Sequence, residues 1–247
     1  MNRKASVQLL KTVKKLHQKK YRKLTGTFIV ERFKTLVPYM EAGWQIDKVF
    51  TTREDYTQKF KGIDVYIVST GEMKKISTLK NPQDILAVVK MKKEENFIEK
   101  NLTLLLDDIQ DPGNLGTIIR TAEWFGIRQM ICSPGTVDVY NPKVIQSAMG
   151  AHARMHIMHK ELTNIIKSTK LPVYIADTNG SDLFRTKLPE NMLLVLGNEG
   201  HGISNELKIM ASQTVTIPYA HGKLSESLNV SVAGSIIISH WFALHRS

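Results

Sequence analysis

The chain has 247 residues, of which 42% are hydrophobic, so it is long enough for one large domain or two small ones with buried cores. No apolar run approaches the ~18 residues that a membrane-spanning helix needs, and the basic N-terminus lacks the apolar segment of a signal peptide. The single cysteine, Cys132, excludes an internal disulfide and a cysteine-based zinc cluster. We therefore expect a cytoplasmic protein without membrane association.

The net charge of +11 is concentrated at the N-terminus. Residues 1–23 contain nine lysines and arginines, Arg22 among them, and no acidic residue. Such a block attracts a polyanion through phosphate contacts, without base specificity. A solvated tail is the alternative, but the apolar residues of the block recur at helical spacing, which favours a cationic helix with one packed face. These residues are Leu9, Leu10, Val13 and Leu16.

The next part of the chain alternates between predicted strands and predicted helices, which indicates a small α/β unit. The highly charged segment 90–101 has little periodicity and reads as a linker. We therefore predict a first domain over residues 1–95 and a second over 96–247. The predicted strands are 27–30, 46–52, 64–68 and 85–89, and the predicted helices are 31–43, interrupted by Pro38, 53–60 and 71–79.

A strand–turn–helix unit over residues 102–126 opens the second domain. The apolar run 102–106 suits a strand that is buried on both faces, and the polar segment 107–113 ends it. A helix is predicted from Leu115, with Asn114 as its N-cap and Gly126 at its C-terminal end. Arg120 lies inside this helix, where its guanidinium either points to water or holds a phosphate in a bidentate grip.

Further strands and helices follow to the end of the chain. The predicted strands are 129–132, 173–176, 192–196 and 215–218; a helix is predicted over 141–149, a turn over 177–180, and a long helix from Leu228. The loop 197–202 has three glycines, which let a backbone approach a ligand closely. One face of the last helix is predicted to carry Val232, Ile236, Ile237, His240 and Leu244.

Three nearby histidines, His152, His156 and His159, raise the question of a metal site. In a strand the first two would face away from the third, and no neighbouring Cys, Asp or Glu completes a ligand set. We therefore expect no metal.

Three segments, in order along the chain, resemble the motifs of the SpoU (TrmH-like) RNA ribose 2′-O-methyltransferase family of the SPOUT superfamily. They are PGNLGTIIRTAEWFG from Pro112, GNEGHG from Gly197, and Ile217-Pro218 followed by SLNVS from Ser227. The front of the chain resembles the L30e-like domain of this family through TGTFIVER and NPQDILAVV. Relatives commonly have glycine at the position of Arg32 and often methionine at that of Tyr219.

The resemblance implies an α/β fold in which a small L30e-like domain precedes a C-terminal trefoil-knot methyltransferase domain that forms homodimers. It implies S-adenosylmethionine as the cofactor, with contacts from Gly197, Ile217 and Leu228. The implied catalytic and RNA-facing set is Arg120, Asn114, Glu199, Ser227 and Asn229.

Arg120 is the residue expected to activate the ribose hydroxyl, although a guanidinium stays protonated and is no simple base. A substrate phosphate beside Arg120 is one candidate for the proton acceptor. Glu199, His201 and His221 are the others by residue type.

We therefore predict an S-adenosylmethionine-dependent methyltransferase that modifies a ribose 2′-hydroxyl of a structured RNA, with ribosomal RNA slightly favoured over transfer RNA. The main alternative is a catalytically inactive RNA-binding or ribosome-assembly protein of the same fold. A nucleotide-binding α/β enzyme of another type is a third reading. The sequence lacks the G-x-G-x-x-G fingerprint of a Rossmann cofactor loop, so cofactor binding must use other loops.

Overall fold

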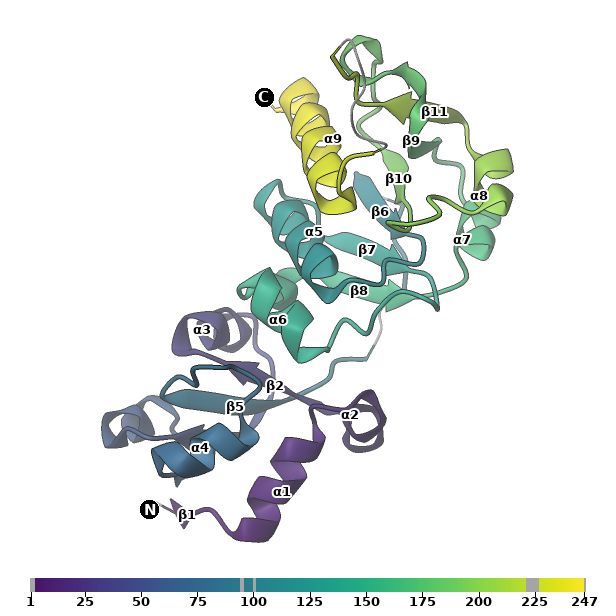
Figure 1. The fold of residues 1–247 in the computed structure, drawn as a ribbon. Coiled ribbons are helices and arrows are strands. Elements are labelled where there is room, and N and C mark those ends of the chain that lie inside the picture. The colour runs from purple at the N-terminus through teal and green to yellow at the C-terminus, as the bar shows by residue number, and fades with distance from the viewer. Residues whose placement is uncertain (1–2, 94–95, 100, 221–226, 247) are drawn as a thin grey trace. The chain divides into compact units, whose positions relative to one another are not determined.

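The computed structural model describes residues 3–93, 96–99, 101–220 and 227–246. The chain divides into two compact units (Figure 1). The N-terminal unit comprises the chain up to Lys93 together with 138–154, and the C-terminal unit comprises 94–137 and the chain from Met155 onward. The predicted domains 1–95 and 96–247 stay a prediction, and the compact units assign the segment 138–154 to the N-terminal unit.

The N-terminal unit is built on a five-stranded sheet in the order β1-β4-β3-β5-β2. Strand β5 runs antiparallel to β2 and β3, whereas β4 runs parallel to β1 and β3. The four strands predicted in this region are confirmed to within one residue at each end, and the short β1 was not predicted. The bounds are β1 (Arg3–Lys4), β2 (Thr27–Glu31), β3 (Ile46–Thr51), β4 (Asp64–Ile67) and β5 (Ile85–Lys90).

The basic N-terminal segment forms two short helices instead of one. Its packed face is confirmed, because Leu10, Val13 and Leu16 are buried. The helix predicted to be interrupted at Pro38 continues through it. The helices of this unit are α1 (Val7–Lys15), α2 (Lys19–Thr25), α3 (Phe33–Glu41), α4 (Thr70–Ile76) and α6 (Pro142–Ala148), with the 3₁₀ turns η1 (Glu54–Lys59) and η2 (Ala151–Arg154).

Arg22 belongs to the basic block that is predicted to attract a polyanion, but its side chain is buried. Its Nε and Nη2 donate to Asp138 Oδ2 at 3.0 and 2.6 Å, and its Nη1 donates to the carbonyls of Leu16 and His17, both at 2.9 Å. The side chain is 2% exposed. Every donor group of this guanidinium faces an acceptor, so Arg22 joins α2 to the segment 138–154 instead of offering charge to a ligand.

An aromatic core also depends on the segment 138–154. His152 is 2% exposed and shares a hydrogen bond of 3.0 Å with the Tyr39 hydroxyl, and Trp44 Nε1 donates to the Ala153 carbonyl at 2.8 Å. Burial lowers the pKa of His152 to about 4 and raises the pKa of Tyr39 well above its ordinary value. His152 is therefore a neutral core residue.

Arg32, at the end of β2, has φ of 75° and ψ of 133°. A residue with a Cβ rarely adopts a positive φ, and such a conformation costs about 1–3 kcal/mol. Glycine adopts it without strain, which accounts for the glycine that the family resemblance leads one to expect here.

The C-terminal unit is built on a six-stranded parallel sheet in the order β11-β9-β10-β6-β7-β8. Strands β6 and β10 are central and fully buried, as their apolar sequences predict. The predictions for β6, β7 and β10 are confirmed to the residue. The bounds are β6 (Leu102–Leu106), β7 (Gln129–Cys132), β8 (His156–His159), β9 (Val173–Asp182), β10 (Met192–Leu196) and β11 (Gln213–Thr216).

The turn predicted over 177–180 is wrong, because β9 continues through it to Asp182. Its last residues pair with β11 after a shift of register between Thr214 and Val215. The pairing with β11 passes from Ile175 to Ser181 while β11 advances by one residue, so the segment 176–180 bulges out of the ladder, and the Asn179 amide donates to Asp177 Oδ1 at 3.3 Å.

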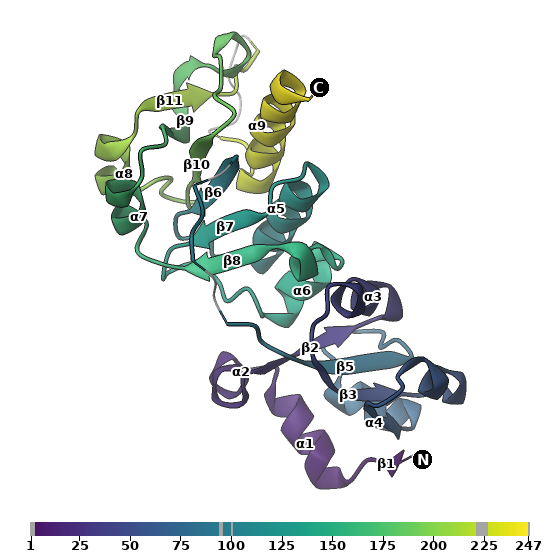
Figure 2. The same ribbon diagram turned by 180° about the vertical axis from the view of Figure 1, so that it is seen from behind.

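Helices cover both faces of this sheet (Figures 1 and 2). Helices α5 and α9 pack side by side, and the hydroxyls of Thr121 and Ser235 lie 3.1 Å apart. Helices α7 and α8 lie on the opposite face. The bounds are α5 (Pro112–Trp124), α7 (Leu162–Ser168), α8 (Asn205–Met210) and α9 (Val230–His245), with the 3₁₀ turn η3 (Leu183–Arg185).

The face of α9 that is predicted to carry Val232, Ile236, Ile237, His240 and Leu244 is not the most buried face of the helix, and of these five residues only Ile237 is fully buried. Val232 and Leu244 are about half exposed, at 47% each. The buried stripe instead runs through Val230, Ser231, Gly234, Ile237, Ile238 and Trp241. A Cβ on Gly234 would lie 2.8 Å from Leu196 Cδ1, so the glycine allows the helix to approach the sheet closely.

Within the described ranges, no helix combines the length and apolar character needed to cross a bilayer.

Candidate active site

The polar residues of the C-terminal unit gather where the central strands end. Strands β6 and β10 are hydrogen-bonded in parallel, and the Asp107 amide donates to the Leu196 carbonyl at 2.9 Å. The loop that leads into α5 and the glycine-containing loop from Gly197 therefore leave the sheet side by side. The edge at the carboxyl ends of the strands is the usual ligand position in an open parallel sheet.

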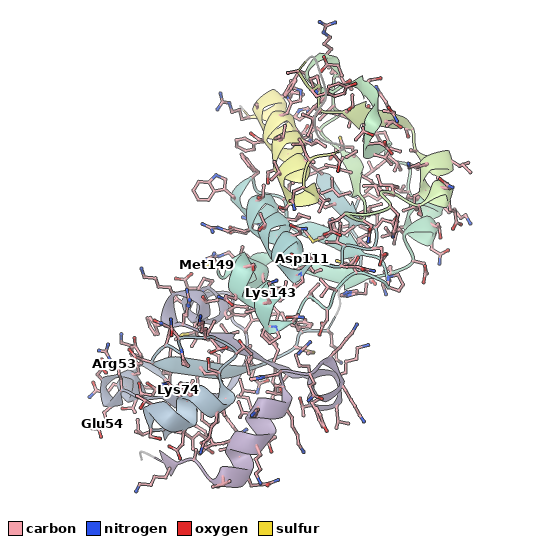
Figure 3. All side chains as sticks on the ribbon, viewed as in Figure 1. Arg53, Glu54, Lys74, Asp111, Lys143 and Met149 are labelled. Carbon is pink, nitrogen blue, oxygen red and sulfur yellow. The ribbon has the colours of Figure 1, made fainter. Side chains whose placement is uncertain are left out.

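Helix α5 begins three residues earlier than predicted. Asp111, which is labelled in Figure 3, is the N-cap. Its carboxylate accepts from the Asn114 amide at 2.9 Å, and Pro112 occupies the first helical turn. An Asp–Pro pair is a strong start signal because proline has no amide hydrogen to satisfy. The prediction of Asn114 as the N-cap is wrong, and its side chain makes contacts with other loops.

Three of the predicted site residues form a continuous hydrogen-bonded chain. Asn229 Nδ2 donates to Asn114 Oδ1 at 2.9 Å, and Asn114 Nδ2 donates to Glu199 Oε1 at 2.8 Å. Asn229 is itself fixed as the N-cap of α9, because its Oδ1 accepts from the amides of Ser231 and Val232. The structure thus brings together residues from three separate motifs.

The loop after β10 has a rigid shape that depends on glycine and on Asn198. A Cβ on Gly197 would lie 2.6 Å from the carbonyl carbon of Gly202, so no larger residue fits. Asn198 Oδ1 accepts from the Gly200 amide at 2.7 Å and its Nδ2 donates to the Asp108 carbonyl at 2.8 Å. These contacts hold the loop against the end of β6 and present Glu199 to Asn114.

Asp108 is a site residue that the sequence analysis missed. It adopts φ of 57°, its carboxylate lies 3.3 Å from His201 Nε2, and its amide donates to Ser133 Oγ at 2.8 Å. The buried Asp107 accepts from the Ser204 amide at 2.8 Å. The available signal is the Asp–Asp pair at the end of a buried strand, which by composition alone indicates no more than the end of the apolar run.

Arg120 lies on the exposed surface of α5, and its side chain makes no hydrogen bond or ion pair with any residue in the described part of the chain. Ser227 and Leu228 are exposed and lead directly to Asn229, while Ile217 follows β11 and is half-buried. Among the described residues, no hydrogen bond or ion pair links the side chains of these residues to the Asn229–Asn114–Glu199 chain. His221, a candidate proton acceptor, lies outside the described residues.

The three histidines considered for a metal site are separated. His152 belongs to the core of the N-terminal unit, whereas His156 and His159 lie on β8. Among the described residues, no group of three or more His, Cys, Asp or Glu side chains is arranged to hold a metal ion.

Comparison with known proteins connects this geometry to a family. Residues 101–239 match the SpoU rRNA Methylase family, and residues 8–87 match the MRM3-like substrate binding domain. The chain is 32% identical to the 23S rRNA (guanosine(2553)-2′-O)-methyltransferase RlmP of Bacillus subtilis over 96% of both chains.

Solved structures agree with this match along the whole chain. A chain from Porphyromonas gingivalis assigned to the TrmH family of RNA methyltransferases has 35% identity and a TM-score of 0.88, over 97% of this chain and 98% of that one. An AdoMet-bound rRNA methyltransferase from Sinorhizobium meliloti has 25% identity and a TM-score of 0.89, over 100% and 99%. The predicted α/β methyltransferase fold is confirmed, and the chain belongs to the SpoU family of rRNA methylases.

Proposed function

We propose that this protein transfers the methyl group of S-adenosylmethionine to a ribose 2′-hydroxyl of ribosomal RNA. The observation that carries the proposal is the Asn229–Asn114–Glu199 chain, which joins all three family motifs at the carboxyl edge of the parallel sheet. The similarity to a 23S rRNA 2′-O-methyltransferase over nearly the full chain supports ribosomal RNA over transfer RNA.

The chemistry of the predicted cofactor residues fits this molecule. Ile217 and the half-exposed Leu228 offer apolar surface for a flat adenine ring, and the glycine-containing loop from Gly197 offers backbone groups for polar atoms. When bound, S-adenosylmethionine supplies an electrophilic methyl group on a sulfonium sulfur. We assign Gly197, Ile217 and Leu228 to its binding.

Arg120 is assigned to the RNA backbone. Its guanidinium is exposed, and no described residue engages it, so its fork of donors is available to a phosphate. A phosphate held there fixes the position of the adjoining ribose, and orientation of this kind supplies much of the rate in a displacement reaction. Ser227 is assigned to the same RNA-facing set, because its exposed side chain lies two residues before Asn229.

The proton of the ribose hydroxyl must leave as the new oxygen–carbon bond forms. Asn114 holds one oxygen of Glu199, so this carboxylate has a fixed position and a second oxygen that can accept a proton. His201, held beside Asp108, is the other described candidate.

The trefoil knot is part of the proposal. Strand β11 is separated from β6 by β9 and β10, and yet α9, which follows β11, packs on α5, which follows β6. The chain must therefore return across the sheet between β11 and α9. Residues 221–226 of this connection lie outside the described part, so the threading stays a prediction.

A homodimer formed through the C-terminal unit is also proposed. Trp124, at the end of α5, is 81% exposed, and Val232 and Leu244 on the adjacent α9 are 47% exposed. Exposed apolar residues on neighbouring helices are typical of an interface. Light scattering of the Trp124→Asp variant and of the unaltered protein tests this proposal. We expect the unaltered protein to be a dimer and the variant to be a monomer, and a monomeric unaltered protein contradicts the proposal.

A protein acting on ribosomal RNA works where ribosomes assemble, in keeping with the predicted cytoplasmic location.

Two measurements on the full chain test the proposed activity. Calorimetry should show binding of S-adenosylmethionine, and incubation with ribosomal RNA from cells that lack the protein should introduce one ribose methylation, mapped by resistance to alkaline cleavage. Cofactor binding or RNA binding without methylation would favour the inactive RNA-binding alternative. Absence of cofactor binding would contradict the assignment of the three cofactor residues.

A further inference from the structure

Two stacked aromatic side chains lie at the surface of the N-terminal unit. Phe33, at the start of α3, and Tyr56, in η1, have ring centroids 5.2 Å apart and ring planes inclined by 9°. Both residues are partly exposed. We call these two residues, together with Lys59 of the same 3₁₀ turn, the aromatic platform. All three belong to the N-terminal unit, so the platform is a property of that unit alone.

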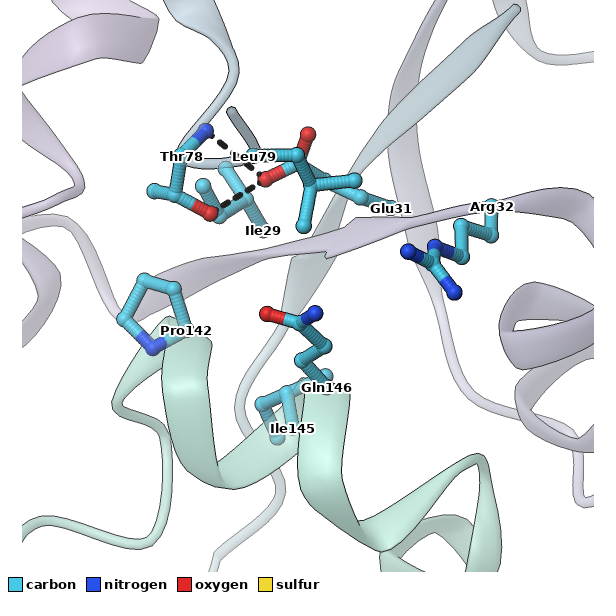
Figure 4. Close-up of a pocket in the computed structure, with 8 residues that line it drawn as sticks. All are labelled: Ile29, Glu31, Arg32, Thr78, Leu79, Pro142, Ile145 and Gln146. Atoms are coloured by element: carbon cyan, nitrogen blue, oxygen red, sulfur yellow. Dashed lines mark hydrogen bonds between the residues drawn. The ribbon is translucent and has the colours of Figure 1, made fainter. Parts of the chain in front are cut away.

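The two rings of the platform have fixed positions because they rest on the core of the unit. Phe60, which is 2% exposed, meets Phe33 edge-on, with ring centroids 6.5 Å apart. The end of β2 just before Phe33 is also anchored, since Glu31 Oε1 accepts from the amide and the hydroxyl of Thr78 at 2.9 and 2.5 Å (Figure 4). Rings that are already ordered lose little conformational entropy when a ligand binds to them.

Positively charged side chains lie over these rings. Lys59 Nζ is 4.6 Å from the centroid of the Phe33 ring and 5.1 Å from that of Tyr56. The guanidinium carbon of Arg53 is 5.0 Å from the Tyr56 centroid. A cation takes such a position only where no apolar side chain packs on the ring face. Both charged residues are exposed, and long side chains of this kind can move aside for a ligand.

The two cations differ in their other partners. Arg53 donates to both carboxylate oxygens of Asp55, at 3.0 and 2.8 Å, and lies 3.9 Å from Asp84. Lys59 makes no hydrogen bond or ion pair with any residue that the structure describes, so its ammonium is available to an anion. A flat apolar face beside one available cation complements a single unpaired nucleotide, which has a base that stacks and a phosphate that is negative.

A second aromatic pair in the same unit lacks this combination. Phe50 and Tyr66 stack with ring centroids 5.3 Å apart and planes inclined by 16°. Phe50 is fully buried, and no cationic side chain that the structure describes lies over either ring. Stacked aromatic rings in this unit therefore do not attract cations by themselves, and the Phe50–Tyr66 pair serves packing alone.

We propose that the aromatic platform binds one unpaired nucleotide of the RNA substrate, with the base stacked on Phe33 and Tyr56 and the phosphate held by Lys59. This inference rests on the proposed function in taking RNA as the substrate. All three residues lie within 8–87, the range that matches a substrate binding domain. Because aromatic rings stack on any base, the platform distinguishes unpaired from paired nucleotides and does not read a sequence.

The test compares a 12-nucleotide single-stranded RNA of mixed sequence with a strand of stable abasic units that carries the same number of phosphates. Fluorescence anisotropy is measured with the full chain and with the double variant Phe33→Leu, Tyr56→Leu, in which leucine keeps apolar contact with the core. The variant should bind the RNA about ten-fold more weakly than the unaltered protein, the loss expected for one stacked base. Both proteins should bind the abasic strand equally.

Tyr66→Leu is the matched control, since it removes a stacked tyrosine of the same unit that has no cation over it among the described side chains. It should leave both affinities unchanged. Lys59→Met keeps an apolar stem over the rings and removes the charge. This variant should make the slope of log K against log salt concentration less steep by about 1, because one phosphate contact is lost.

Three results would overturn the inference. They are unchanged binding of the RNA by the double leucine variant, an equal loss on the RNA and on the abasic strand, and an unchanged salt dependence in Lys59→Met. Binding is measured without S-adenosylmethionine, and methylation is measured separately. Failure of the proposed function and failure of the platform therefore give different results.

Discussion

Arg22 in the N-terminal unit and Arg120 in the C-terminal unit are the same residue type in opposite situations. Arg22 is buried, and all of its donor groups are directed at one carboxylate and two carbonyls. Arg120 is exposed on α5 and has no partner among the described residues. The first arrangement uses the guanidinium to hold the protein together, and the second leaves it available to a ligand. The hydrogen-bond partners of an arginine, more than its charge, therefore indicate whether it has a structural or a functional role.

The histidines repeat this contrast. His152 is enclosed by aromatic rings and is bonded to Tyr39. His201 is largely exposed beside Asp108 at the edge of the sheet. The polar groups of the N-terminal unit described here contribute to stability, whereas those at the carboxyl edge of the C-terminal unit are positioned for chemistry.

The largest expected effect is the loss of methyl transfer in Arg120→Ala. Removing a donor that acts on the reacting groups lowers the rate by about 10²–10³-fold, and we expect at least that in single-turnover methylation at saturating cofactor and RNA. Arg120→Lys should also be poor, because it lacks the bidentate geometry. Arg185→Ala, at an exposed position of the same unit, is the control and should keep its activity. A near-normal rate in Arg120→Ala would refute the proposed role.

Arg22→Ala should have the opposite phenotype, a loss of stability. It leaves the Asp138 carboxylate, whose side chain is 13% exposed, without its partner, and breaking a buried pair costs about 3–5 kcal/mol. Urea unfolding should show this, with the exposed Lys23→Ala as the control. The double variant Arg22→Met, Asp138→Leu should recover part of the loss, because it removes both charges. A loss below about 1 kcal/mol in Arg22→Ala would contradict the structural role.

Acid should destabilise the N-terminal unit through His152. Its folded-state pKa of about 4 lies below the ordinary value near 6.5, so the unfolded chain binds more protons between these values. Its contribution to stability is complete above pH 6.5 and is lost as the pH falls toward 4, with a loss of about 2 kcal/mol at pH 5. Urea unfolding at pH 7 and pH 5 measures this loss, and His152→Gln should show a smaller difference. Equal pH dependence in both proteins would exclude the histidine as the cause.

The smallest effect is expected from the exposed lysines of α1 and α2. The substitution of four exposed lysines by glutamine should weaken RNA binding. The slope of log K against log salt concentration should become less steep by up to about 3. The four residues are Lys14, Lys15, Lys19 and Lys20. The methylated nucleotide should stay the same, since these residues contact phosphates. An unchanged salt dependence would show that this surface does not meet the RNA. Deleting residues 1–23 is a poorer experiment, because it also removes the buried Leu10, Val13, Leu16 and Arg22.

The central strands β6 and β10 of the C-terminal unit could be predicted from the sequence because burial on both faces leaves a continuous apolar run. Strand β8 was not predicted, and β11 begins and ends two residues before its predicted bounds. The sequence of β6 alone fixes its bounds, and the same holds for β10. The extension of β9 could not be predicted in this way, since it depends on pairing with β11. The packed face of α9 was also missed, because an almost wholly apolar helix has no clear polar side to orient it.

The candidate site was predictable as a set of residues but not as a geometry. Family motifs supplied Asn114, Glu199 and Asn229, and the structure adds that they bond to one another. Asp108 and the burial of Arg22 were missed because each depends on a partner distant in the sequence. Asp108 meets His201, and Arg22 meets Asp138. Local patterns carry no information about such pairs.

The placement of the segment 138–154 in the N-terminal unit has a consequence for the order of folding during synthesis. When a ribosome has made the first 93 residues, the nascent unit still lacks Asp138 for Arg22 and His152 for Tyr39. Its aromatic core can close only after β6, α5 and β7 of the other unit have been made, because they precede this segment in the chain. The first region of the protein to be translated is therefore not the first that can complete its fold, and a fragment cut after residue 93 would expose the surface that the later segment covers.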